Sequence, residues 1–291
     1  MKHTILGAGA IGGLVAAALS SLGEDVTFIV RPEKLAAHPP LLEVAHPAGT
    51  LSASAKLAAR VDGPVDVLWI ATKTYQLDEA LALVDTTSGI VVPLLNGVDH
   101  VAVLRARFGH DRVVPGTIAV EAERSAAGRF VRRSAPRLNL AASGEAVLGG
   151  CVERLRGMGW TCSFIASEPT LLWTKLCFLE PFALVTSASG KNNGEMLADP
   201  EWKGRMDAAV QEACAVAVKE GAEVHPEKWV PAFSGMPATM RASMAKDLDA
   251  GRKLELDGIA GPVLRGGVRH GVPTPMTASL VAMIEARERR K

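Results

Sequence analysis

A glycine-rich loop near the N-terminus contains the first residues with a clear chemical use. Residues 7–12 read Gly-Ala-Gly-Ala-Ile-Gly, the pattern G-x-G-x-x-G, between a strand-like and a helix-like segment. In such loops the first glycine allows a tight turn, the second lets a pyrophosphate approach the backbone, and the third lets helix and strand pack closely. The loop therefore predicts a dinucleotide site made of Gly7, Ala8, Gly9, Ala10, Ile11 and Gly12, with a ligand-free turn as the alternative.

Arg31 follows the second strand-like segment, where NAD(H)-binding loops usually carry an acidic residue for the ribose 2′-hydroxyl. A guanidinium suits a 2′-phosphate instead, because it forms bidentate, charge-assisted hydrogen bonds. We therefore predict that the cofactor is NADP(H). The alternative is that Arg31 is a solvated surface residue.

Polar residues also follow two later apolar segments. Lys73 comes after residues 65–71, and Asn96 comes after residues 89–95. In an open parallel sheet, ligands bind beyond the carboxyl ends of the strands. We expect both side chains to face a cofactor and substrate crevice. The alternative for Lys73 is an ordinary loop lysine, and the alternative for Asn96 is a plain turn or a helix cap.

Lys175 lies on the apolar face of a helix-like segment, with leucines at positions 171, 172, 176 and 179 around it. An ammonium group there is either partly desolvated or reaches water along its own aliphatic stem. Desolvation would lower its pKa and make it a proton donor near neutral pH. Both interpretations stay open on the sequence alone.

Glu255 stands between two leucines, with Ile259 one helical turn further on. A carboxylate on an apolar face needs a partner, and Lys175 is a candidate from another helix. The alternative is a half-exposed glutamate that the dipole of a helix N-terminus stabilises.

The elements that must position these residues change in character along the chain. The first half alternates strand-like segments (3–6, 25–30, 65–71, 89–95 and 113–120) with helix-like ones (11–22 and 98–108). Strands that are apolar almost throughout are buried on both faces, as in a parallel sheet covered by helices. Two further stretches, 41–59 and 128–140, are predicted to be short antiparallel or irregular pieces.

After residue 165 the pattern is helical, over residues 171–184, 206–220, 236–248, 254–269 and 276–289. Gly221 is expected to end the second of these helices, and Thr274 to cap the last one. The fold class predicted is α/β, with an N-terminal Rossmann-type doubly wound sheet over residues 1–166 and a C-terminal all-helical domain over residues 167–291.

Composition excludes several classes of partner. The 291 residues contain 32 Lys and Arg against 31 Asp and Glu, so we expect no electrostatic binding to nucleic acid or to a membrane surface. The four cysteines show neither CxxC nor zinc-ligand spacing, which predicts buried thiols, no metal site and a cytoplasmic location. No run of about 20 uninterrupted apolar residues predicts a membrane span.

Together these residues resemble the ketopantoate reductase (2-dehydropantoate 2-reductase) family over nearly the whole chain. The motifs in order are residues 7–13, 31, 72–76, 95–98, 173–176, 243–247, 254–257 and 270–275. The resemblance implies NADPH-dependent reduction of a 2-oxo acid, ketopantoate, to D-pantoate in pantothenate biosynthesis. It leaves a homodimer open, because the sequence does not fix the oligomeric state.

The resemblance also implies roles for individual residues. Lys175 would be the general acid, Glu255 would support catalysis and hold substrate, and Lys73 and Asn96 would line the cofactor and substrate crevice. Ser243 would contact the substrate carboxylate, and Asn193 matches a further substrate-binding asparagine. Because Lys175 and the glycine loop fall in different domains, we expect these residues to converge between the two.

Two positions depart from the family pattern, since Leu179 and Ala183 stand where asparagines are usual. Each lost amide removes a hydrogen bond worth about 0.5–1.5 kcal/mol. One alternative is therefore a paralogue that reduces a more apolar 2-oxo acid or ketone. A non-catalytic NADP(H)-binding sensor is another, although the retained Lys175 and Glu255 argue against it.

Overall fold

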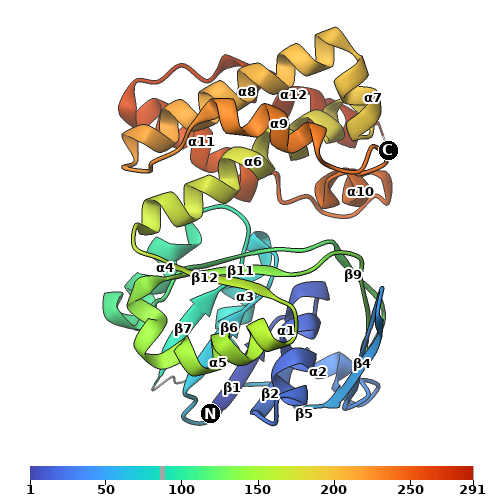
Figure 1. The fold of residues 1–291 in the computed structure, drawn as a ribbon, viewed down its shortest axis with the longest axis vertical. Coiled ribbons are helices and arrows are strands. Elements are labelled where there is room, and N and C mark those ends of the chain that lie inside the picture. The colour runs from blue at the N-terminus through green and yellow to red at the C-terminus, as the bar shows by residue number, and fades with distance from the viewer. Residues whose placement is uncertain (86–88, 291) are drawn as a thin grey trace. The chain divides into compact units, whose positions relative to one another are not determined.

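We describe a computed structural model of the chain, which covers residues 1–85 and 89–290 (Figure 1). The chain divides into two compact units. One consists of residues 1–95 and 100–166, and the other of residues 96–99 and 167–291. We call them the sheet unit and the helical unit. The predicted boundary after residue 166 does not account for residues 96–99, which belong to the helical unit although they precede that boundary.

A five-stranded parallel sheet forms the centre of the sheet unit. Its strands run in the order β5 (Lys56–Ala58), β2 (Asp25–Ile29), β1 (Lys2–Leu6), β6 (Val67–Ile70) and β7 (Ile90–Pro93). Side chains on both faces are buried, among them Phe28, Leu68 and Trp69, which explains the apolar runs in the sequence. The helices of this unit are α1 (Ala10–Ser21), α2 (Pro32–Leu35), α3 (Leu77–Leu81), α4 (His100–Phe108) and α5 (Glu145–Gly157). The predicted parallel α/β fold is confirmed.

Two smaller sheets complete the sheet unit. One has the order β4 (Gly49–Ser54), β3 (Leu41–His46), β10 (Arg129–Arg132) and β9 (Ala122–Ala126), and the other has the order β12 (Thr161–Ile165), β11 (Arg137–Ala141) and β8 (Gly116–Ala119). The β3–β4 hairpin is antiparallel, as predicted for residues 41–59, but β5 at the end of that stretch joins the parallel sheet. In the stretch 128–140, β10 and β11 each pair parallel with one neighbour, which the prediction of antiparallel or irregular pieces did not include. The strand predicted at 113–120 pairs antiparallel with β11 and does not extend the parallel sheet as a full strand.

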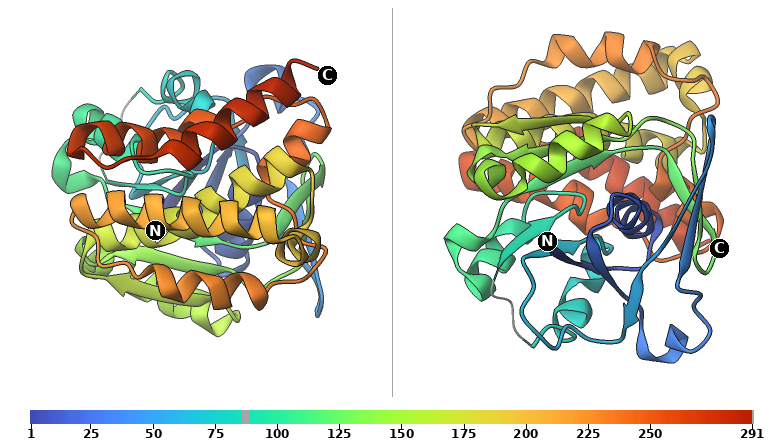
Figure 2. Two further views of the ribbon diagram at one scale, coloured as in Figure 1. Left: turned by 90° about the horizontal axis from the view of Figure 1, so that it is seen from above. Right: turned by 60° about the horizontal axis from the view of Figure 1, so that its bottom comes forward.

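The helical unit contains α6 (Glu168–Ser189), α7 (Asn193–Ala198), α8 (Pro200–Lys219), α9 (Trp229–Ser234), α10 (Ser243–Asp249), α11 (Leu256–His270) and α12 (Pro275–Glu288). Helix α6 is its core, and it packs against α8, α10 and α12 (Figure 2). Within the described residues, α6 alone is long and apolar enough to cross a bilayer. However, 78% of its apolar window is buried inside the protein, as in a core helix.

The helix predicted over residues 236–248 is shorter in the structure, where it begins only at Ser243. Residues before Ser243 form a loop instead, and two of its carbonyls, on Met240 and Ala238, accept the backbone N–H groups of Asn193 and Gly194. Pro237 contributes to the difference, because the residue before a proline is disfavoured in the α region. Conversely, Pro181 does not interrupt α6, which continues to Ser189.

The start of α12 differs from the prediction in its chemistry. Thr274 occupies the N-cap position, but its side chain makes no capping hydrogen bond. The carboxylate of Glu212, from α8, instead accepts the N–H groups of Met276 at 2.7 Å and Thr277 at 2.8 Å. A carboxylate satisfies two free amides at once and carries the charge that a helix N-terminus attracts. Gly221, with φ of +86°, ends α8 as predicted.

The four cysteines are buried thiols, which confirms their predicted packing role. Burial raises the pKa of Cys151 to about 11, so this thiol stays protonated at neutral pH. Burial also raises the pKa of Glu180, a fully buried carboxyl group on α6.

Candidate active site

The glycine loop between β1 and α1 has three glycines with three different environments. Gly7 has φ of +119°, and a Cβ there would lie 2.7 Å from the backbone of Ala71. A Cβ on Gly12 would overlap the carbonyl oxygen of Gly7, so close helix–strand packing requires this glycine. A Cβ on Gly9 would meet only the Ala71 oxygen, at an ordinary 3.9 Å. The fold therefore explains Gly7 and Gly12 but leaves the space beside Gly9 open.

The N-terminus of α1 adds electrostatic features to this loop. Gly9 is the N-cap residue, and the first turn of α1 carries neither a side-chain cap nor an acidic residue. Such a helix end attracts phosphate, because its free N–H groups point outward and its dipole is positive there. Arg124 of β9 donates a hydrogen bond to the Ala8 carbonyl at 3.0 Å. No sequence motif indicates this arginine, because β9 meets the glycine loop only through the tertiary fold.

Arg31 lies two residues after the end of β2 and immediately before α2. Its guanidinium is half exposed and lies 3.7 Å from the carboxylate of Glu79. An exposed pair of this length is weak, so a phosphate could replace Glu79 as the partner of Arg31. Lys73 is half buried and begins a short turn after β6, with its N–H donating to the Gln76 side chain at 3.4 Å.

Three predicted residues meet inside the helical unit. The ammonium of Lys175 on α6 donates to Asn96 Oδ1 at 3.0 Å, and Asn96 Nδ2 donates to Glu255 Oε2 at 3.2 Å. Glu255 immediately precedes α11 and is only 3% exposed, so the half-exposed alternative does not hold. The Asn96 amide therefore bridges the ammonium and the carboxylate, because it uses its acceptor for one and its donor for the other.

The surroundings of Lys175 tune its acidity. Burial lowers the pKa of Lys175 from 10.5 to about 8, and the negative charge of Glu255 acts in the opposite direction. Lys175 as a whole residue is partly buried, and Asn96 holds its ammonium group in place. A group with this pKa is mostly protonated at neutral pH and gives up its proton readily. The arrangement therefore has the properties of a general acid.

Two other predicted substrate residues lie in different settings. Asn193 is fully buried, and its Nδ2 donates to the carbonyls of Phe233 at 2.9 Å and Met236 at 3.4 Å. Its amide therefore supports the chain after α9, which the spacing in the sequence did not indicate. Ser243 is exposed at the first turn of α10. Leu179 is partly buried against the helical core, and Ala183 is fully buried in it.

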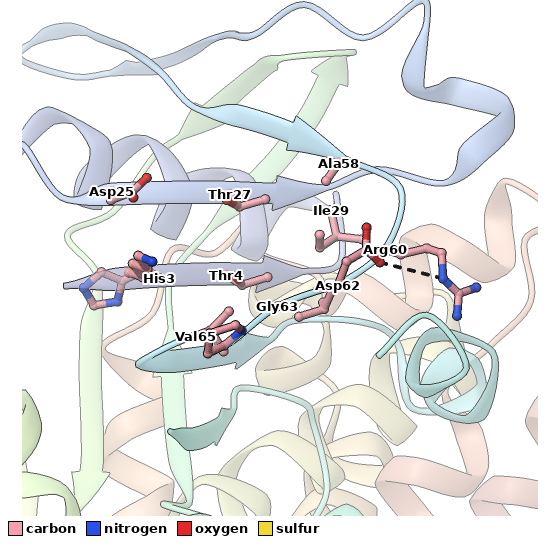
Figure 3. Close-up of a pocket in the computed structure, with 13 residues that line it drawn as sticks. His3, Thr4, Asp25, Thr27, Ile29, Ala58, Arg60, Asp62, Gly63 and Val65 are labelled. Carbon is pink, nitrogen blue, oxygen red and sulfur yellow. Dashed lines mark ion pairs between the residues drawn. The ribbon is translucent and has the colours of Figure 1, made fainter. Parts of the chain in front are cut away.

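A cavity of about 250 Å³ lies elsewhere in the sheet unit (Figure 3). It is lined by the first residues of β1, by β2 from Asp25 to its last residue Ile29, and by the loop that carries Arg60 and Asp62. The glycine loop leaves β1 at the opposite, carboxyl end. The lining of this cavity includes neither residues 7–12 nor Arg31 nor Lys73, so the cavity does not coincide with the candidate cofactor site.

Comparison with known proteins identifies the family. Residues 3–145 match the family model described as "Ketopantoate reductase PanE/ApbA", and residues 170–288 match its C-terminal model. The chain belongs to the ketopantoate reductase family. Members of this family are oxidoreductases that act on a CH–OH or C=O group with a nicotinamide cofactor.

Individual ketopantoate reductase relatives cover almost the full length. A 2-dehydropantoate 2-reductase of Caulobacter vibrioides is 30% identical over 295 residues, which is 97% of each chain. A ketopantoate reductase structure from Ralstonia eutropha JMP134 matches with a TM-score of 0.88 at 22% identity, and covers 100% of this chain and 99% of its own. A ternary structure of D-mandelate dehydrogenase with NADH and anilino(oxo)acetate gives the same score, identity and coverage. These structures establish the shared fold.

Proposed function

We propose that the protein is an NADPH-dependent 2-oxo acid reductase in which Lys175 donates the proton. The observation that carries this proposal is the hydrogen-bonded chain Lys175–Asn96–Glu255, together with a lysine pKa of about 8. A lysine that only extended its ammonium group to water would not be hydrogen-bonded to an amide that also binds a buried carboxylate. The family supports the coarser assignment to nicotinamide-dependent carbonyl chemistry.

The residues of the sheet unit fit a nicotinamide dinucleotide. The open side of Gly9 and the uncapped end of α1 would accept the pyrophosphate, while Arg31 would accept the 2′-phosphate. Lys73 follows β6 at the carboxyl end of the parallel sheet, where we propose that it faces cofactor and substrate. When bound, the cofactor supplies the hydride for the carbonyl carbon.

The helical unit supplies the charge and the proton. As the carbonyl oxygen gains negative charge, the Lys175 ammonium stabilises it and transfers a proton to it, which leaves a neutral amine. Asn96 holds the Nζ atom in place, and Glu255 fixes Asn96 while its charge favours the protonated lysine. A positioned acid of this kind contributes about 10²–10⁴-fold to the rate.

The first candidate substrate is 2-dehydropantoate, which the name of the Caulobacter relative supports. A second candidate is a 2-oxo acid with an apolar or aromatic group. The side chains of Leu179 and Ala183 contain no polar atoms, and the Asn193 side-chain amide donates its hydrogen bonds to backbone carbonyls. The D-mandelate dehydrogenase of the same fold binds anilino(oxo)acetate, whose name denotes an aromatic group.

Steady-state turnover tests these proposals directly. The purified protein is assayed with NADPH and either 2-dehydropantoate or phenylglyoxylate, with Lys175→Ala as the inactive control. Higher kcat/KM for 2-dehydropantoate supports pantoate formation in pantothenate biosynthesis, and higher kcat/KM for phenylglyoxylate supports the apolar alternative. Binding of NADPH without turnover of either compound or of a wider panel of 2-oxo acids overturns the reductase and supports a sensor.

A Leu179→Asn variant sharpens the comparison. Leu179 is partly buried, so an amide there keeps access to polar partners, whereas an amide in place of the fully buried Ala183 would lack them. If the apolar substrate is native, Leu179→Asn should lower its kcat/KM and raise that of 2-dehydropantoate.

A further inference from the structure

Residues 96–99 connect the Lys175 site to a part of the chain that precedes the helical unit in the sequence. The chain on either side, β7 and α4, belongs to the sheet unit, while this four-residue segment belongs to the helical unit. Its first residue, Asn96, bonds to both Lys175 and Glu255. The geometry of the site therefore depends on what fixes the segment on the helices.

Close packing against α11 is the first contact. Gly97 has φ of +80°, and a Cβ there would overlap the carbonyl oxygen of Gly258 in the first turn of α11. Val98 packs against the hydrophobic core of the helical unit. The backbone of the segment thus lies directly on the helix that begins after Glu255.

An ion pair at the other end of the segment is the second contact. Arg265 of α11 donates to Asp99 Oδ2 through Nε at 3.1 Å and Nη2 at 2.6 Å. Its remaining nitrogen, Nη1, donates to Asp257 at 2.7 Å. These two carboxylates raise the pKa of Arg265. The Arg265 guanidinium therefore joins residues 96–99 to Asp257 in the first turn of α11, and Asp257 lies two residues after Glu255.

We propose that Arg265 and Asp99 are positioning residues for the Lys175 site. Their pair fixes the far end of residues 96–99 on α11, and so it keeps Asn96 between Lys175 and Glu255. The planar guanidinium makes this contact directional, which a lysine could not reproduce. The effect on rate rests on the proposed function, whereas the anchoring of the segment does not.

The consequence for catalysis should exceed the consequence for stability. Arg265 and Asp99 are each about half exposed, at 47% and 48%, and exposed pairs add little to folding stability. A misplacement of about 1 Å in a catalytic group can nevertheless cost about 10²-fold in rate. Arg269 provides a matched control, because it lies one turn further along α11 and pairs with Glu220 at 2.6 Å, away from the segment.

The kinetic test uses full-length Arg265→Ala, Asp99→Ala and Arg269→Ala. We expect the first two to lower kcat by about 10–100-fold, with an unchanged Kd for NADPH and an unchanged melting temperature, and Arg265→Lys to recover only part of the loss. Arg269→Ala should retain wild-type kcat. In an Asn96→Ala background, Arg265→Ala should cause no further loss, because the residue that it positions is gone.

Hydrogen–deuterium exchange tests the anchoring without any turnover. Peptides that span residues 94–104 should exchange faster in Arg265→Ala and Asp99→Ala than in the wild type or in Arg269→Ala. Unchanged exchange overturns the proposal, and so does a full kinetic loss that persists in the Asn96→Ala background. If the wild type reduces no 2-oxo acid, the proposed function fails, and exchange alone decides whether the pair anchors the segment.

Discussion

At the scale of single residues, two opposing influences set the acidity of Lys175. Burial destabilises its charged form, while the negative charge of Glu255 stabilises it. The resulting pKa of about 8 lies close to physiological pH, where a general acid is most effective. The balance between the two influences is open to direct measurement.

We expect kcat/KM for carbonyl reduction to be constant below the Lys175 pKa of about 8 and to fall above it, because only the ammonium form can donate a proton. Glu255→Gln removes the influence that raises the Lys175 pKa, so the falling limb should move to lower pH. A pH profile of kcat/KM from about 6 to 10 for both proteins checks this. A limb that stays in place, or moves upward, would refute the role assigned to Glu255.

Arg31 should decide between the two nicotinamide cofactors. Hydrogen bonds to a charged group are worth about 1.5–3 kcal/mol, so Arg31→Ala should weaken NADPH binding by about 10–100-fold and NADH binding much less. Isothermal titration with both cofactors measures the difference. Glu79→Gln is the matched control, since it removes the ion-pair partner and should leave NADPH binding intact or tighter. Equal losses for both cofactors in Arg31→Ala would contradict the assignment.

At the scale of elements, the start of one helix, α12, is fixed by a side chain from a distant part of the chain. Glu212 on α8 caps α12 across the helical unit, although Thr274 is the local residue with the right chemistry. Helix α11, in contrast, has carboxylates of its own at its start, on Glu255 and Asp257.

Glu212→Gln should therefore destabilise the protein by about 0.5–2 kcal/mol, because it replaces a charged acceptor of two helix amides with a neutral one. Thr274→Ala should change stability by less, since its side chain makes no capping hydrogen bond. Urea unfolding followed by circular dichroism compares the two. A larger loss for Thr274→Ala than for Glu212→Gln would show that the local cap dominates.

At the scale of the whole molecule, the residues proposed for cofactor binding and those proposed for proton donation belong to different compact units. The glycine loop lies in the sheet unit, while Lys175, Asn96 and Glu255 lie in the helical unit. Convergence of Lys73 with the helical residues stays a prediction, as does a homodimer. The division itself implies that the two steps can be impaired separately.

Gly9→Ala should abolish NADPH binding, because the added Cβ would occupy the space through which the pyrophosphate approaches the backbone. It should leave the melting temperature of the free protein unchanged, because within the protein the Cβ meets only Ala71 O, at 3.9 Å. Lys175→Ala should do the reverse, with NADPH affinity retained and kcat reduced by about 10²–10⁴-fold. Fluorescence titration of NADPH and thermal unfolding separate these outcomes. Full NADPH affinity in Gly9→Ala would remove the glycine loop from the cofactor site.

Elements with local signals could be predicted from the amino-acid sequence alone. The run Gly7 to Gly12 predicts a turn between strand and helix because backbone geometry demands glycine there, and apolar runs such as 65–71 predict buried parallel strands. Periodicity likewise predicted the cores of α6, α8 and α12. It also placed Lys175 on an apolar face, although without its partners.

Only the tertiary structure decided which distant residues meet. Asn96 joins Lys175 and Glu255, and Asp99 joins Arg265, across long stretches of chain that no periodic pattern links. In the folded protein, the Asn193 side chain donates to a backbone carbonyl, and the Glu212 carboxylate caps α12. The physical reason is that a buried polar group must find a partner wherever the fold offers one, and that choice depends on packing, which a local sequence pattern does not encode.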